Sequence, residues 1–147
     1  MNLPRRRRRL VIAGRTGSTV FCTVTALGVV WPEGAGPAAQ VTALVLFAAG
    51  CAAYGRAYVL AVRRSRSERI STLAAFLQMP GASPALRAEF RITTGLQFAA
   101  GLTGAALRPF GVLAFGILAG VYGLGLIGLW GASFGVFPPR SLPSGRK

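Results

Sequence analysis

The chain contains no histidine, and only three of its 147 residues are acidic. Histidine is the commonest general base and metal ligand, so most acid–base and metal chemistry lacks its usual side chain. Proton-coupled pumps and drug antiporters typically depend on an acid within the bilayer, whereas Glu33, Glu68 and Glu89 all lie outside the apolar runs. We therefore expect neither an enzyme nor a bound metal or other cofactor.

Two glycine-containing patterns are typical of enzymes but do not suit this chain. Residues 123–128 fit G-x-G-x-x-G, a dinucleotide-binding pattern that works only at a turn between strand and helix, whereas here it lies within an apolar run. Residues 131–135 fit G-x-S-x-G, the pattern around a serine nucleophile, but Ser133 has no histidine to act as its base. We interpret the first segment as helix interior and the second as a helix end.

Cysteine is also scarce. Cys22 and Cys51 both fall within apolar runs, which supports neither a disulfide framework nor a secreted protein. We expect two buried thiols that fill space at matching depth in neighbouring helices.

The composition that remains is typical of a membrane protein. The chain is 52% hydrophobic and 14% charged, its mean hydropathy is +0.53, and its apolar residues form long runs. The net charge of +14 comes almost entirely from arginines in blocks beside these runs, where they indicate topology and contact with anionic lipid. Nucleic acid is an unlikely partner.

Four apolar segments predict an all-α integral membrane protein with four transmembrane helices in an antiparallel bundle. The spans cover about residues 10–31, 38–62, 90–108 and 110–130. The third is the weakest, because its 16 uncharged residues make a helix of only about 24 Å against a hydrocarbon core of about 30 Å. A re-entrant hairpin of the third and fourth segments is the alternative.

The distribution of basic residues predicts that both termini lie in the cytoplasm. The N-terminal segment 1–9, the stretch 63–91 between the second and third spans, and the tail 138–147 hold 14 basic residues, whereas the outer connections hold only Arg108. The cytoplasmic side of a membrane protein is the side rich in Lys and Arg. Trp31 and Trp130 are placed as interface anchors would be, and we expect the inner or plasma membrane.

The segments outside the spans are less regular. We expect a turn-rich outer loop at 32–37 and a disordered tail at 138–147, which follows a membrane domain of residues 10–137. Within the loop 63–89, residues 66–79 form either an interfacial helix or a continuation of the second helix, with Ile70, Leu73, Phe76 and Leu77 on one face. Ser83 then caps the third helix, with Pro84 at its first position.

Two sets of residues are candidates for function. Arg15 and Arg56 lie at similar depth, and with Gln97, Thr94 and the basic residues Arg63 and Arg64 they predict contacts to an anionic lipid headgroup. Snorkelling of these arginines to the inner surface is the alternative to a polar cleft. The second set has the spacing of close helix packing or of a partner face, and comprises Gly101, Gly104, Gly116, Gly120 and Gly123.

These features favour a non-enzymatic role. We expect an accessory, scaffold or assembly subunit of a membrane complex, which contacts anionic lipid of the inner leaflet and either a membrane-protein partner or further copies of itself. The alternative is a small oligomeric channel, or a carrier of lipid or an anionic solute. A four-helix membrane fold does not decide between them.

Overall fold

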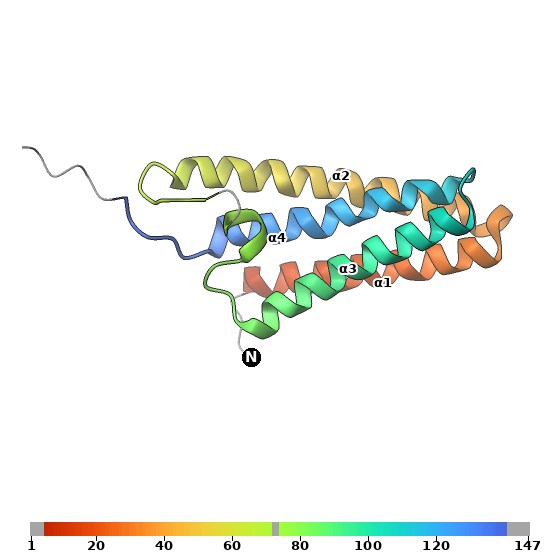
Figure 1. Cartoon of the computed structure of the whole chain (residues 1–147), viewed down its shortest axis with the longest axis horizontal. Coiled ribbons are helices and arrows are strands. Elements are labelled where there is room, and N and C mark those ends of the chain that lie inside the picture. Colours follow the sequence, from red (N-terminus) through yellow and green to blue (C-terminus); the bar gives the residue numbers. More distant parts are fainter. Residues whose placement is uncertain (1–4, 72–73, 141–147) are drawn as a thin grey trace, which may run out of the picture.

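The structure is a computed structural model that describes residues 5–71 and 74–140. These residues are 83% helical and form no strand. The elements are, in chain order, α1 (Arg5–Val30), α2 (Pro32–Arg64), the short η1 (Ala74–Gln78), α3 (Pro84–Leu107), η2 (Val112–Ala119) and α4 (Gly120–Phe134) (Figure 1). The predicted all-α class is confirmed.

Three helices are long and apolar enough to cross a membrane: α1, α2 and the continuous unit Val112–Phe134, which combines η2 with α4. They correspond to the first, second and fourth predicted spans. α3 is 24 residues long but is not among these three, and polar residues such as Arg91, Thr94 and Gln97 interrupt its apolar run. The membrane assignment therefore rests on three helices.

The four long helices lie side by side (Figure 1). The colour gradient in Figure 1 runs one way along α1 and back along α2, and it reverses again between α3 and α4. α1 contacts α2 and α3, while the η2–α4 unit contacts both α2 and α3. The connections between consecutive helices therefore gather at the two ends of an elongated molecule.

Small residues allow these helices to approach closely. Every residue that α2 buries is glycine or alanine: Gly36, Ala39, Ala43, Gly50, Ala57 and Ala61. A Cβ added to Gly50 would lie 2.6 Å from the backbone nitrogen of Tyr122, so the backbones of α2 and α4 are in contact there. Close backbone approach through small residues is how membrane helices gain packing energy without a hydrophobic driving force.

The first two helices begin earlier than the sequence predicts. α1 includes the arginines of segment 5–9, a residue type with high helix propensity. α2 starts at Pro32 instead of residue 38, so the predicted outer loop 32–37 is wrong. Proline is tolerated at the first position of a helix, where its missing N–H has no partner to lose, and Trp31 alone turns the chain.

The loop after α2 is neither of the two predicted forms. α2 ends at Arg64, so it does not continue to Met79, and residues 74–78 form a single five-residue π-helical turn. Phe76 is buried beside Ala57 and Ala132, whereas Leu77 is exposed. Leu73 lies outside the described residues.

The start of the C-terminal tail pairs with this loop. The backbone N–H of Arg69 donates to the carbonyl of Pro138 at 2.9 Å, and that of Arg140 donates to Ser67 at the same distance. The disorder predicted for 138–147 is therefore wrong for residues 138–140, because their backbone groups find partners. The predicted disorder of residues 141–147 lies outside the described residues.

One predicted helix boundary is confirmed and one predicted anchor is not. Ser83 caps α3, since its hydroxyl oxygen accepts from the N–H of Leu86, and Pro84 is the first helical residue. Trp130 was expected at the membrane interface, but it is 1% exposed and belongs to the largest buried cluster. Its neighbours include Leu86, Phe90 and Leu126, so it serves as core.

The fourth segment begins as a 3₁₀-helix. The buried residues of η2 are Leu113, Gly116 and Ala119, a spacing of three that matches the three residues per turn of this helix type. The α-helical part begins at Gly120 and ends at Phe134, four residues beyond the predicted end at 130. Gly135 follows as the C-terminal cap, so residues 131–135 are a helix end as predicted.

Candidate functional site

Gln97 is buried at the centre of the bundle. It is 0% exposed, its Nε2 donates to the Ser18 hydroxyl at 2.8 Å, and its Oε1 accepts from the backbone N–H of Gly123 at 3.1 Å. Gly123 lies in the first turn of α4, just after the change from 3₁₀-helical to α-helical geometry at Gly120. One amide therefore joins α1, α3 and α4.

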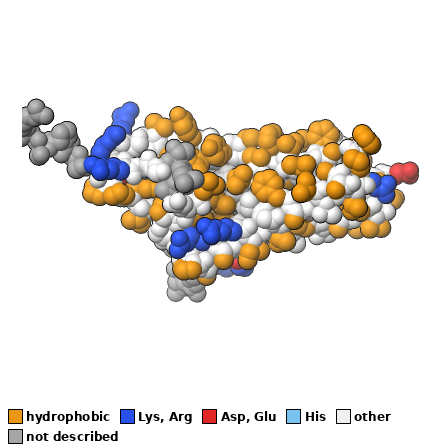
Figure 2. Space-filling view, in the orientation of Figure 1, with side chains coloured by type: hydrophobic (Ala, Val, Ile, Leu, Met, Phe, Trp, Pro, Cys, Tyr) orange, Lys and Arg blue, Asp and Glu red, His pale blue; other side chains and the backbone are white. Residues whose placement is uncertain are grey.

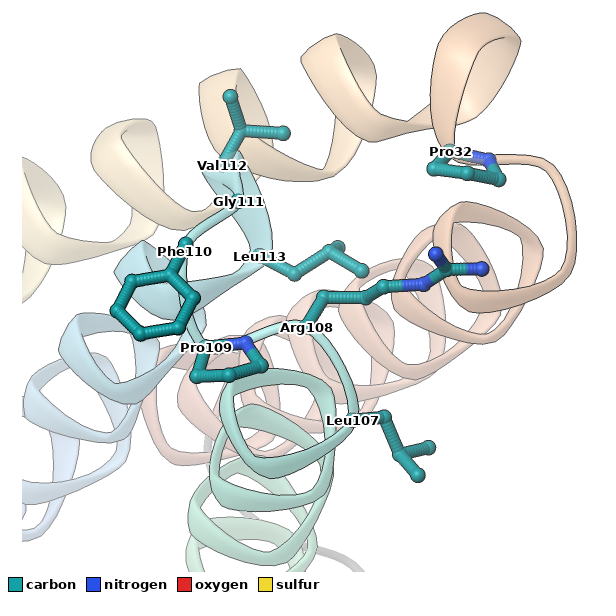
Figure 3. Close-up of a pocket in the computed structure, with 8 residues that line it drawn as sticks. All are labelled: Pro32, Leu107, Arg108, Pro109, Phe110, Gly111, Val112 and Leu113. Carbon is teal, nitrogen blue, oxygen red and sulfur yellow. The ribbon is translucent and has the colours of Figure 1, made fainter.

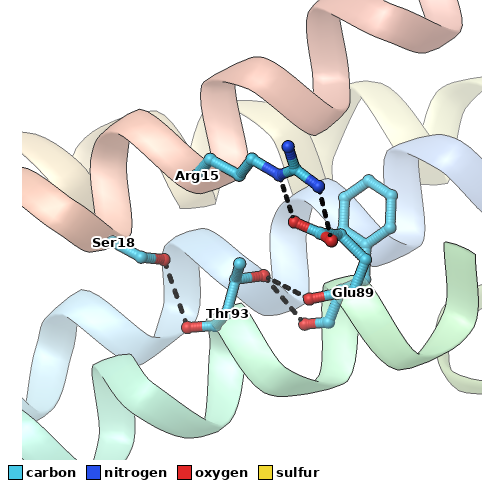
Figure 4. A network of polar contacts seen from close by, with 5 residues as sticks. Arg15, Ser18, Glu89 and Thr93 are labelled. Atoms are coloured by element: carbon cyan, nitrogen blue, oxygen red, sulfur yellow. Dashed lines mark hydrogen bonds and ion pairs between the residues drawn. The ribbon is translucent and has the colours of Figure 1, made fainter. Parts of the chain in front are cut away.

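Arg15 makes an ion pair with Glu89 across α1 and α3 (Figure 4). Two nitrogens contact two carboxylate oxygens, Nε at 2.5 Å and Nη2 at 2.8 Å. The hydrogen bond from Arg15 is the main cause that lowers the pKa of the Glu89 carboxyl below its ordinary value. This partner was not predicted, because the two residues are 74 positions apart in the chain.

The predicted cleft of Arg15, Arg56 and Gln97 does not form. Arg15 is already paired with Glu89, and Gln97 is enclosed by its two partners. Arg56 lines a different cavity, which includes neither of the other two residues. Thr94, predicted beside them, is buried in α3.

That cavity is a groove of about 550 Å³ between the N-terminal end of α1 and the C-terminal ends of α2 and α4. We call it the arginine groove. It is lined by Arg6, Arg9, Leu10, Arg56, Leu60, Arg64, Leu129, Ala132, Ser133 and Phe134. Of the predicted headgroup contacts, Arg56 and Arg64 belong to it, while Arg63 is exposed nearby in the chain and does not line it.

Arg64 is held firmly in this groove. Its Nη1 donates to the carbonyl of Ala132 at 3.0 Å, and its Nη2 donates to that of Gly135 at 2.9 Å. It also makes an i,i+4 ion pair with Glu68 at 2.6 Å and lies over the ring of Phe137. A cation at carbonyls of the last turn stabilises the C-terminal end of α4.

The other three arginines of the groove differ from Arg64. Arg6, Arg9 and Arg56 are exposed, and neither ion pair found among the described residues involves them. Their charges therefore face the open volume of the groove without a neutralising carboxylate.

Arg7 explains how the end of α1 is positioned. Its guanidinium lies 5.0 Å from the ring centroid of Phe134 and 5.9 Å from that of Trp130. Cation–π contacts of this kind stabilise a guanidinium over an aromatic face. They fix the N-terminal end of α1 on α4 and bring Arg6 and Arg9 to the groove.

Basic side chains gather unevenly over the surface. In the view of Figure 2 most blue side chains lie toward one end, hydrophobic side chains cover the length of the helices, and one small blue group lies beside a red one at the other end. In this view an apolar band lies between a strongly basic end and a weakly charged end.

The opposite end of the molecule holds a second cavity of about 450 Å³ (Figure 3). Its lining is mostly apolar, and Phe110 on its rim is fully exposed. Its single cation, Arg108, donates to the carbonyl of Val29 at 3.4 Å, in the last turn of α1. Arg108 therefore complements the end of a helix, and the cavity offers no cluster of polar groups.

The predicted glycines pack inside the molecule. A Cβ added to Gly101 would collide with the carbonyl group of Gly116, and one added to Gly104 would lie 3.1 Å from Thr25. Gly120 faces Phe98, and Gly123 faces Thr94. All five glycines are buried, so they act in helix packing and present no free face to a partner.

The remaining sequence motifs have structural positions. The pattern at 123–128 lies within α4, so its glycines form no strand-to-helix turn. Cys22 is half-buried beside the carbonyl of Leu96, but Cys51 is exposed, so the expectation of a buried thiol is wrong for Cys51. It faces outward because α2 turns Gly50, the preceding residue, toward α4.

Sequence reasoning did not identify Arg6 and Arg9 as site residues. The arginines at 5–9 were interpreted only as a topology signal. Their spacing could have indicated it, because Arg6 and Arg9 are three positions apart and residues at this spacing share a helix face. This inference requires α1 to start at Arg5, as it does in the structure.

No protein-family model, curated protein or solved structure matches this chain.

Proposed function

We propose that this protein is a non-enzymatic accessory, scaffold or assembly subunit of a complex in the inner or plasma membrane. It has four membrane-spanning helices in an antiparallel bundle, and both termini lie in the cytoplasm. The observation that carries the proposal is the closed core, in which Gln97 is fully buried and bonded at both ends of its amide.

The closed core favours a structural role over transport. The amide that would line a polar path instead joins three helices, and the Ser18 hydroxyl donates a hydrogen bond to the carbonyl of Thr93. A transport path would then have to form between copies of the chain, as in the alternative of an oligomeric channel.

The faces of α3 support its place as a fourth span. Its buried residues include Thr94 and Gln97, whereas Ile92, Leu96 and Leu102 are between 51% and 63% exposed. Polar groups turned inward and apolar groups turned outward suit a helix surrounded by lipid. Thr94 and Gln97, two of the polar residues that interrupt the apolar run of α3, therefore lie where lipid would not touch them, whereas Arg91 is exposed.

A partner of this subunit has to contact the outward faces of the helices, because the five predicted glycines are already buried against neighbouring helices. Two glycines give a direct probe of these faces. A Cβ at Gly55 on α2 or at Gly95 on α3 would meet nothing within 4 Å, so leucine at either position leaves the fold intact and adds bulk outside.

The test is affinity purification of the full chain in mild detergent, followed by protein identification and native mass measurement. We expect a stoichiometric membrane-protein partner with the wild type, and its loss in Gly55→Leu or Gly95→Leu. A homo-oligomer without a partner would favour the channel alternative. A monomer without any partner would contradict the accessory role.

A further inference from the structure

The arginine groove carries more positive charge than its own residues neutralise. Four guanidinium groups line it, and among the described residues only one of the four, Arg64, is paired with a carboxylate, that of Glu68. Of the other two carboxylates, Glu89 pairs with Arg15 on α1 and α3, and Glu33 lies in the first turn of α2, at the opposite end of that helix from Arg64. Three like charges around one open volume repel each other unless an anion enters.

The kind of anion follows from the donor groups. A guanidinium presents paired N–H donors that match the oxygens of a phosphate, and arginines are preferred where phosphate is recognised. The hydroxyl of Ser133 lines the same groove and can donate one more hydrogen bond. The groove therefore suits a phosphate group in particular.

Apolar walls distinguish a lipid from a free ion. Leu10, Leu60, Leu129 and Phe134 line the groove together with the arginines. A free phosphate would touch only the polar donors, whereas the glycerol and first acyl carbons of a phospholipid would also cover these apolar side chains.

The depth of the groove agrees with a lipid. Arg56 and Arg64 are eight residues apart on α2, which corresponds to about 12 Å along the helix. That length reaches from the headgroup region into the first part of the hydrocarbon core. Long arginine side chains can extend toward a headgroup from such depths.

We propose that the arginine groove is a binding site for the phosphate of an anionic phospholipid headgroup. Arg6, Arg9 and Arg56 supply the free guanidinium donors, and Arg64 forms the fixed wall at the end of α4. The placement of this lipid in the inner leaflet rests on the proposed topology, but its binding to the groove does not.

The test compares two triple variants that remove the same charge from the same helices. The groove variant is Arg6→Gln/Arg9→Gln/Arg56→Gln, and the control is Arg5→Gln/Arg8→Gln/Arg63→Gln, whose exposed side chains do not line the groove. Arg64 is left unchanged because it holds the end of α4. The purified full chain in detergent is titrated with phosphatidylglycerol, with phosphatidylcholine of the same acyl chains, and with inorganic phosphate.

We expect phosphatidylglycerol to bind the wild type in preference to phosphatidylcholine, and to bind the groove variant on the order of a hundredfold more weakly. The control variant should change by less than about threefold at 0.15 M salt, where exposed charges beyond about 8 Å are screened. Inorganic phosphate should bind far more weakly than the lipid.

Equal losses in the two variants would overturn the proposal, because binding would then follow net charge. Inorganic phosphate that binds as tightly as the lipid would overturn the assignment to a lipid. If the triple variant does not fold, Arg56→Gln alone should still weaken binding about tenfold. Absence of a protein partner would affect the accessory role and leave this result unchanged.

Discussion

Gln97 shows how a single side chain organises the bundle. Its amide has both a donor and an acceptor, and it uses them on two different helices while its own backbone belongs to a third. A buried polar group without partners would be costly. Hydrogen bonds at both the nitrogen and the oxygen of this amide therefore fix the relative positions of α1, α3 and α4.

Replacement of Gln97 by leucine should destabilise the protein by about 1–2 kcal/mol, because Ser18 and the N–H of Gly123 lose a buried partner. The free energy of unfolding in detergent measures this effect. Gln78→Leu is the matched control, since Gln78 is exposed, and it should change stability by less than about 0.5 kcal/mol. Equal effects of the two substitutions would contradict the role of Gln97.

The pair of Arg15 and Glu89 makes stability depend on pH. Because the pKa of Glu89 is lowered in the folded protein, its contribution is present above the ordinary glutamate pKa of about 4.3 and is lost as the pH falls through the lowered value. The unfolding midpoint of the wild type should therefore approach that of Glu89→Gln as the pH is lowered from 6 to 3. A constant difference between the two would contradict the pairing.

At the scale of helices, one of the closest contacts is between α3 and η2. Gly101 and Gly116 bring the two backbones together, with the Gly101 Cα 3.1 Å from where a Cβ on Gly116 would lie. Backbone atoms cannot move aside as a flexible side chain can. This contact is therefore sensitive to a single added methyl group.

Gly101→Ala should lower the free energy of unfolding by about 1–3 kcal/mol, because the new Cβ overlaps the carbonyl of Gly116. Gly95→Ala on the same helix is the control, because its Cβ meets nothing within 4 Å and alanine is the better helix former. It should be neutral or stabilising. Thermal unfolding in detergent compares the two, and a Gly101→Ala variant as stable as Gly95→Ala would refute the contact.

Apolar runs and capping residues predicted much of the helical structure. They gave the helical class, the three spans now seen as α1, α2 and Val112–Phe134, and the start of α3 at Ser83. They did not give the helical state of residues 32–37, since glycine and proline in sequence also indicate a turn. The π-helical turn at 74–78 was also missed, because it depends on Phe76 packing between α2 and α4.

The site was less predictable than the fold. Arg56 and Arg64 were identified from their depth and position, but the role of Gln97 depends on a hydrogen bond to Ser18, 79 positions away in the chain. Arg6 and Arg9 depend on Arg7 lying over Phe134, a contact between the two ends of the chain. The spacing of residues along the sequence does not predict contacts between residues so far apart in the chain.

For the whole molecule, the surface differs from that of a soluble protein. Many large apolar side chains, such as Val45, Tyr58 and Leu102, are exposed, while small residues of α2 and polar residues of α3 fill some of the contacts between helices. Such a surface suits surroundings of lipid. A role in the membrane therefore depends most on whether all four long helices cross the bilayer.

The most direct test is the side of the membrane on which each end of α3 lies. In a chain with Cys22→Ala and Cys51→Ala, single cysteines at Ala85→Cys, in the first turn of α3, and at Phe110→Cys, just after its end, occupy exposed positions. A membrane-impermeant thiol reagent reports their side in intact cells. We expect the cysteine at 110 to react from outside and the one at 85 to react only after the membrane is opened. Labelling of both from the same side would show that α3 does not span, and would contradict the four-helix membrane bundle.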